Sequence, residues 1–167
     1  WILDPKKKHR GNFALGLGIK LPTGNPEALD EFHRRKSNGE DSVFRKAVDQ
    51  SIQLGDGGFG YSLELQGYQR LFKNASLFYS GFYLFNPRNT NNNFRGGNNP
   101  ITKYNSVPDQ FAVRAGMIYS MLRNKNLSAT LCGRVEGLPA HDIIGKSDGF
   151  RRPGYIISVE PGVGYRT

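Results

Sequence analysis

The stretch QFAVRAGMIYSMLRNKNLSATLCGRVEGL, residues 110–138, decides the fold that we predict for this chain. On both sides of the polar segment Asn124–Asn126, apolar side chains at odd positions alternate with small or charged side chains at even positions. Successive side chains of a strand point to opposite faces of the pleat, so this period of two predicts a long antiparallel hairpin. A three-residue loop at Asn124–Asn126 sets the register. The cross-strand pairs predicted from it are Arg123–Leu127, Tyr119–Leu131 and Arg114–Glu136.

Two architectures accommodate such a hairpin. A soluble β-sandwich would bury the apolar face and expose the charged face to solvent. An outer-membrane barrel instead turns the apolar face to lipid and the charged face to a water-filled lumen. The strands run over about 11–14 residues, against roughly 5–6 in ordinary globular sheets. Strand length therefore favours an all-β, antiparallel, up-and-down transmembrane β-barrel.

The same alternation recurs along the chain, so that it predicts six strands in all. The other predicted strands are residues 12–20, 59–72, 75–85 and 154–166. Residues 75–85 are apolar at both parities, which leaves the orientation of that strand open. Pro161 lies inside the last strand and predicts a β-bulge there.

The connections between strands alternate between short and long. The short ones are Asp4–Gly11, Lys73–Asn74 and Asn124–Asn126, and the long ones lie near 22–57, 87–109 and 139–153. Bacterial outer-membrane barrels combine tight periplasmic turns with long extracellular loops, so we expect the long connections to face outward. Within the first of them, Pro26 and the segment Ser42–Val48 predict two short helices. The cluster Gly55–Gly58 is followed by a strand and by no Lys-Ser/Thr pair, so it is interpreted as a loop and not as a phosphate cradle.

Composition bounds the function. The chain has 167 residues, a net charge of +9 and no apolar run of about 18 residues, which indicates one domain without a helical membrane span. The basic clusters, such as Lys6–Arg10 and His33–Lys36, fall in connections and accompany no nucleic-acid-binding motif. We therefore expect no nucleic-acid partner. Basic loops of this kind suit the phosphates of lipopolysaccharide or anionic headgroups of the lipid bilayer.

Catalytic and metal-binding patterns are absent from the sequence. Cys132 is the single cysteine and forms no disulfide or metal pattern. His9, His33 and His141 all fall in connections, and the Asn/Gly-rich loop near residues 89–99 lacks the clustered carboxylates of a calcium site. We predict no catalytic, cofactor or metal residues, and we predict that the protein is not an enzyme. The residues predicted to face the lumen are Glu64, Arg70, Arg114, Arg134, Glu136, Glu160 and Arg166.

The inventory of strands suggests a larger barrel. Residues 1–3 fit the tail of a strand, the chain starts at Trp1 without an initiator Met or signal peptide, and it stops at Arg166-Thr167. Single-chain bacterial barrels have an even number of strands, whereas six strands plus a remnant is odd. We expect the sequence to be part of a larger barrel domain with strands at both ends.

Four segments carry a resemblance to a known family. They are GLGIKLPTG (16–24), DQSIQLGDGG (49–58), FNPRNT (85–90) and SVEPG (158–162). In these segments the chain is similar to the bacterial outer-membrane barrels grouped with the MetA-pathway phenol-degradation proteins. The resemblance implies an outer-membrane location in a Gram-negative-type envelope and passage of small, often aromatic, compounds. It brings no catalytic residue to this sequence.

The sequence thus predicts a porin-like barrel that passes small, possibly aromatic or hydrophobic, solutes across the bacterial outer membrane. The alternative is a structural or adhesive outer-membrane module without an open pore, associated with other envelope proteins or with further copies of itself. A soluble lipid-binding barrel is disfavoured by the long strands and the one-sided long loops.

Overall fold

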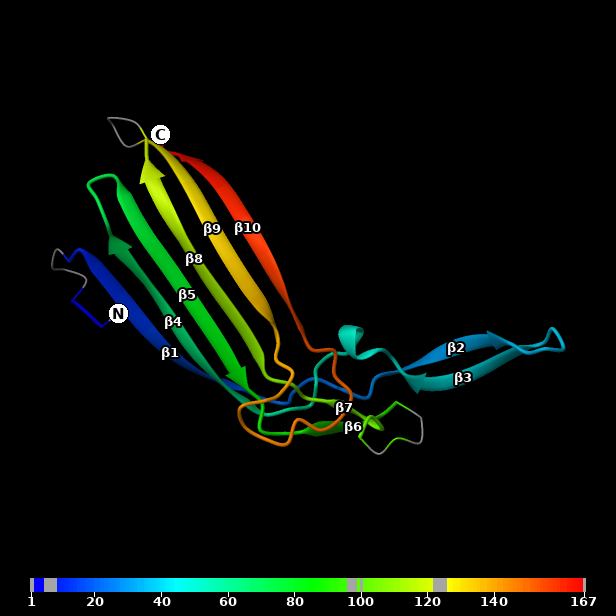
Figure 1. Ribbon diagram of the computed structural model, residues 1–167. Helices are drawn as coiled ribbons and strands as arrows, with labels where there is room; N and C mark the ends of the chain where they lie inside the picture. The colour runs from blue at the N-terminus through cyan, green and yellow to red at the C-terminus, as the bar shows by residue number, and fades with distance from the viewer. Residues whose placement is uncertain (1, 5–8, 96–98, 100, 122–125, 167) are drawn as a thin grey trace.

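The computed structural model describes residues 2–4, 9–95, 99, 101–121 and 126–166. Its main feature is a six-stranded antiparallel sheet in the order β1-β4-β5-β8-β9-β10. The strands are β1 (Gly11–Lys20), β4 (Gly60–Arg70), β5 (Ala75–Phe85), β8 (Gln110–Ser120), β9 (Leu127–Leu138) and β10 (Gly154–Tyr165). Each pairs with the strand that follows it in this sheet, so the sheet runs up and down as the alternation predicted. Within the described residues the sheet is open, with β1 and β10 at its edges (Figure 1).

The remaining elements gather at one end of the sheet, which we call the loop end (Figure 1). They are β2 (Leu29–Arg35), β3 (Asp41–Ala47), the 3-10 helix η1 (Gln50–Ile52), β6 (Thr90–Phe94) and β7 (Tyr104–Ser106). The β2–β3 hairpin projects away from the sheet, whereas β6 and β7 lie against its end. The described parts of the three long connections thus contain regular elements, and they meet at this loop end.

The two helices predicted in residues 22–57 are wrong, because both segments form the β2–β3 hairpin. Its turn contains Asn38-Gly39, in which Gly39 has φ +86° and Lys36 donates its backbone N–H to Glu40 O at 2.8 Å. Asn-Gly favours the positive φ of hairpin turns and is a stronger local signal than the weak helical spacing. Phe32 and Phe44 stack across the strands with ring centroids 6.0 Å apart.

The predicted register of the β8–β9 hairpin is also wrong, by two residues. Arg114 lies opposite Arg134 and Tyr119 lies opposite Ala129, while Met121 N donates to Leu127 O at 2.8 Å. The loop on which the prediction rested falls largely on residues 122–125, outside the described residues. A shift of two preserves parity, so the assignment of side chains to faces is unaffected.

The bulge predicted at Pro161 is absent, because Pro161 pairs with Leu131 in an unbroken register along β9 and β10. Proline removes a backbone donor and is tolerated in an edge strand, the position that β10 has in this sheet. Beside the other edge strand, Ile2 N donates to Phe13 O at 2.8 Å, so residues 2–4 lie next to β1, although they do not form the predicted strand.

The register gives all six strands a common parity, and this defines two faces. The apolar face consists of the odd-numbered positions of the six strands and the polar face of the even-numbered ones. The orientation of β5, left open by its sequence, follows from pairing: Phe82 lies opposite Glu64, so the even positions of β5 belong to the polar face. Within these six strands no odd position holds a charged residue, whereas charged residues occupy even positions on five of them.

The described residues do not form an ordinary apolar core. Of the described residues, the buried hydrophobic ones are Ala75, Leu84, Val107 and Cys132. The apolar face is instead exposed: Leu17 retains 88% of its accessible surface and Val163 retains 80%. Other exposed side chains on this face are Leu15, Ile19, Tyr61, Leu63, Leu65, Val113, Met117, Tyr119, Leu131, Tyr155, Ile157, Val159 and Tyr165.

Candidate functional site

The polar face is hollowed over its centre into a cavity of about 410 Å³. Small residues from β1, β5 and β8 form its floor: Ala14, Gly16, Ser80, Gly81 and Ala112. Its charged lining residues are Glu64, Arg114, Arg134 and Glu136. The hollow exists because β1, β5 and β8 carry small residues near the middle of the polar face. Longer charged side chains surround these small residues.

A network of ion pairs crosses the polar face from β8 to β10. Glu160 is its centre, since its carboxylate lies 2.8 Å from Arg114 Nη2 and 3.3 Å from Arg134 Nε. Arg134 also lies 3.4 Å from Glu136 on its own strand. All four side chains are partly exposed, so each ion pair contributes little to stability by itself. The main effect of the network is to fix the positions of these charged side chains on the polar face.

The partner of Arg114 differs from the predicted one. Glu136 lies opposite Ala112, and Arg114 instead reaches across β9 to Glu160, two strands away. On this path Arg114 Nε donates a hydrogen bond to Cys132 Sγ at 3.1 Å. Cys132 is free and buried, and its even position places it on the polar face.

Of the seven residues predicted to share one face, the structure brings four into the network. Glu64 lines the hollow from β4, opposite Gly16 and Phe82. Arg70 lies at the far end of β4 and donates to Lys73 O at 3.1 Å, and Arg166 follows β10 near Asn126. These last two belong to the turn end of the sheet and lie apart from the network.

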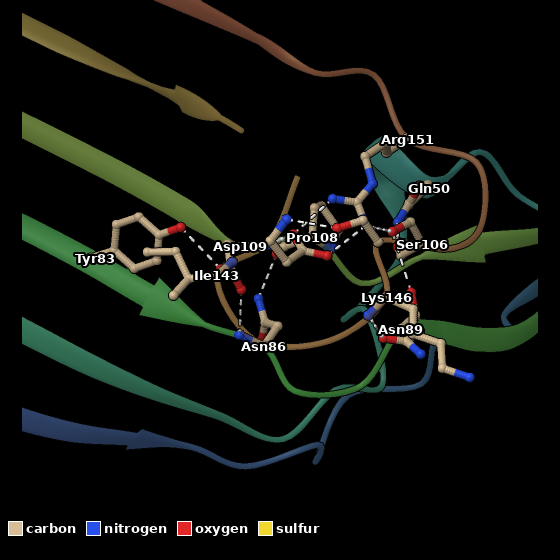
Figure 2. A network of polar contacts seen from close by, with 12 residues as sticks. Gln50, Tyr83, Asn86, Asn89, Ser106, Pro108, Asp109, Ile143, Lys146 and Arg151 are labelled. Atoms are coloured by element: carbon tan, nitrogen blue, oxygen red, sulfur yellow. Dashed lines mark hydrogen bonds and ion pairs between the residues drawn. The ribbon is translucent and has the colours of Figure 1, made fainter. Parts of the chain in front are cut away.

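The sequence did not reveal a second cluster, which lies at the loop end (Figure 2). Asp142 and Arg151 form a two-pronged ion pair, 2.6 and 2.7 Å from donor to acceptor, with exposed side-chain fractions of 1% and 7%. Asp109, also fully buried, accepts hydrogen bonds from the Tyr83 hydroxyl and from the backbone N–H groups of Asn86 and Ile143. Asp109 N in turn donates to Asp142 Oδ1 at 2.9 Å.

This loop-end cluster joins all three long connections. Arg151 donates to Ser106 Oγ at 2.7 Å, and Gln50 Nε2 donates to Ser106 O at 2.7 Å. Asn86 Nδ2 donates to Pro108 O and Lys146 N donates to Asn89 Oδ1 (Figure 2). Polar groups buried in this way need partners, and each segment supplies partners for another. The cluster thus holds the loops in a fixed position above the end of the sheet.

The ionisation of Asp142 links this cluster to pH. Burial by itself would raise the pKa of Asp142, but hydrogen bonds from Arg151 and from the Asp109 backbone hold it below its usual 3.8. A depressed carboxyl pKa stabilises the folded state fully above the unfolded pKa, and this contribution is lost as pH falls through the folded pKa.

We therefore expect the loop end to become progressively less stable as pH falls below the ordinary carboxyl pKa of 3.8, while its stability at neutral pH is unaffected. Protection of the Ser106 and Phe150 amides against hydrogen exchange measures this opening, because these two N–H groups bond to Phe150 O and Tyr104 O. In the Asp142→Asn variant the residual protection should depend less on pH. An unchanged acid profile would exclude Asp142 as the titrating group.

His33 and His141 lie at exposed positions on separate segments of the described chain. His33 Nδ1 lies 2.6 Å from Asp41 on the exposed β2–β3 hairpin, and the His141 side chain is exposed within the 139–153 connection. Among the residues that the structure describes, no three His, Cys, Asp or Glu side chains gather as metal ligands. That the protein is not an enzyme stays a prediction.

No family model, curated protein or solved structure matches this chain. In the part of the chain that is described, no helix is long and apolar enough to cross a membrane.

Proposed function

We propose that this chain forms part of the wall of a bacterial outer-membrane β-barrel, and that its polar face lines a path for small solutes. One observation carries the proposal: six strands of 10–12 residues share an exposed face without a charged residue, and their charges stand on the opposite face. A transmembrane strand needs about 9–11 residues, and barrel walls alternate apolar-out with polar-in. Exposed apolar surface of this extent is unfavourable in water but suits hydrocarbon.

Aromatic side chains on the apolar face support a membrane position. Near the loop end, the cross-strand pairs Tyr61–Phe85 and Tyr83–Phe111 stand close to one level, with Tyr155 beyond them on β10. Tyr119 and Tyr165 stand near the opposite end of the face. Aromatic side chains at both ends of an apolar band correspond to the aromatic girdles of barrels at the two membrane interfaces.

Because the sheet has open edges, a barrel built from it requires further strands. Unpaired backbone N–H and C=O groups in hydrocarbon cost several kcal/mol each, so a membrane sheet must close. Further strands beside β1 and β10 would satisfy both edges. The resemblance to the MetA-pathway phenol-degradation group agrees with a larger barrel and stays a proposal.

Conductance of the full-length barrel protein in planar bilayers tests the pore. Glu160→Gln removes the carboxylate that neutralises Arg114 and Arg134, so we expect the reversal potential under a KCl gradient to move toward anion preference. Glu31→Gln is a matched control, because it removes the same charge from the exposed β2–β3 hairpin, where Glu31 lies 3.9 Å from Arg45. An unmoved reversal potential in Glu160→Gln would contradict the lining role of the polar face. Absence of any pore in the wild type would favour the structural or adhesive module.

The orientation of the barrel has its own test. Trypsin added to intact cells should cleave the β2–β3 hairpin near Arg35 and Lys36, which are exposed, and spare Lys73 in the short turn between β4 and β5. Mass spectrometry of the released peptides identifies the sites. Cleavage at Lys73 in intact cells, with an uncut hairpin, would reverse the proposed orientation.

A further inference from the structure

A second cavity, of about 650 Å³, lies at the loop end beside the Asp142–Arg151 pair. Four parts of the chain line it: β2 and β3 with η1, β6 with β7, the start of β8 with the end of β9, and the connection before β10. Its volume falls in the range of about 300–1,000 Å³ that is usual for small-molecule sites.

The cations that line this cavity differ in whether a carboxylate neutralises them. Arg151 is paired with Asp142, and Arg152 lies 3.8 Å from Asp49, whose pKa is lowered by hydrogen bonds from Ser51. Lys46 and Arg95 also line the cavity, and neither forms an ion pair with any described residue. The two lining carboxylates are already engaged, since Asp56 lies 2.6 Å from Lys20. The cavity therefore has an excess of positive charge from Lys46 and Arg95.

Aromatic rings hold these two cations in place. Lys46 Nζ lies 4.4 Å from the ring centre of Phe32, and the Arg95 guanidinium lies 3.4 Å from the ring centre of Phe150. Both rings, together with Phe94, line the cavity. A cation placed on a ring keeps its charge available to an anion, whereas a cation paired with a carboxylate does not.

We propose that this cavity binds small organic anions with an apolar or aromatic body, such as aromatic carboxylates. The carboxylate meets Lys46 and Arg95, and the body packs against Phe32, Phe94 and Phe150. Gln110 and Leu138 also line the cavity and stand at even positions of β8 and β9, so it opens onto the loop end of the polar face. A role in collecting solutes for passage rests on the proposed function, whereas binding itself does not.

The test is equilibrium dialysis of radiolabelled benzoate against the purified protein in detergent at neutral pH. We expect saturable binding, at least tenfold weaker for neutral benzamide and for acetate, which lack the charge and the ring respectively. Lys46→Gln combined with Arg95→Gln should reduce the affinity for benzoate at least tenfold, whereas Arg95→Lys should retain most of it. Arg45→Gln is the matched control, because Arg45 adjoins Lys46 on β3 but does not line the cavity. Lys46 and Arg95 are exposed, so the double variant should fold, which an unchanged tryptic pattern of the remaining sites would verify.

The binding and conductance experiments can fail independently, so they distinguish the anion site from the proposed pore. Saturable benzoate binding that the double variant loses supports the site, even if bilayers show no pore and the proposed function fails. Equal binding of benzamide and benzoate, or equal affinity in the double variant, overturns the site while conductance can still establish the pore. Binding of lipopolysaccharide phosphates without benzoate binding would also overturn it, in favour of an envelope-lipid contact.

Discussion

Leu131→Arg is expected to destabilise the membrane-inserted protein by about 2–4 kcal/mol, the cost of a cation near the bilayer midplane on a lipid-facing wall. Leu131 is the fifth of the twelve residues of β9, close to mid-strand, and it stands on the apolar face with 60% of its surface exposed. The guanidinium would replace an alkyl side chain surrounded by other apolar side chains, among them Met117 and Pro161 on the adjacent strands. The measurement is the urea dependence of unfolding from phospholipid vesicles.

Thr130→Arg is the matched control, since it introduces the same side chain one residue away. Thr130 stands on the polar face, opposite Ile118 and beside Gly162, where a guanidinium can remain hydrated. We expect a much smaller loss of stability for this variant. Equal losses for the two variants would show that both faces meet the same medium, and the membrane proposal would then be wrong.

The second large effect is expected at the loop end, where Asp142→Asn should cost about 3–5 kcal/mol in the free energy of opening the loops. The substitution leaves the Arg151 guanidinium buried without a counter-charge, and a buried ion without a partner loses solvation that nothing restores. Replacing both partners, in Asp142→Asn with Arg151→Gln, should cost less than Asp142→Asn alone. Native-state hydrogen exchange of the Ser106 and Phe150 amides gives the free energy of opening.

An exposed pair nearby provides the comparison. Asp49 and Arg152 lie 3.8 Å apart with 52% and 69% of their side-chain surface exposed, so Asp49→Asn should change the opening free energy by less than about 1 kcal/mol. If the buried and exposed substitutions have the same effect, the Asp142–Arg151 pair does not organise the loop end.

The local alternation of apolar and polar residues was sufficient to predict the strands of the six-stranded sheet. The alternation along residues 110–120 and 127–138 predicted β8 and β9, and the same period predicted β1, β4 and β10. Parity also placed Cys132 and the charged residues on one face, because a residue's face depends only on the pleat. Helices were predicted where β2 and β3 form, because Pro26 suits a first helical turn. The Asn38-Gly39 turn between the two segments instead favours a hairpin.

Contacts between segments distant in sequence could not be predicted. The Asp142–Asp109 hydrogen bond spans 33 residues and the Gln50–Ser106 bond spans 56. Asn, Asp and Ser are common in any loop, so no spacing marks these particular residues as buried. The partner of Arg114 likewise depended on a register set at the turn, and a change of two residues replaced Glu136 by Glu160 without altering either face.

The sequence by itself thus determined that six long strands form, that they pair in chain order, and that their charges occupy one face, because these properties follow from period-two alternation and connection length. Only the tertiary structure decided the orientation of β5, the pairing of charges on the polar face and the assembly of the loop end. Those depend on cross-strand register and on buried polar groups finding partners across the fold, which are properties of three-dimensional packing and not of any local stretch.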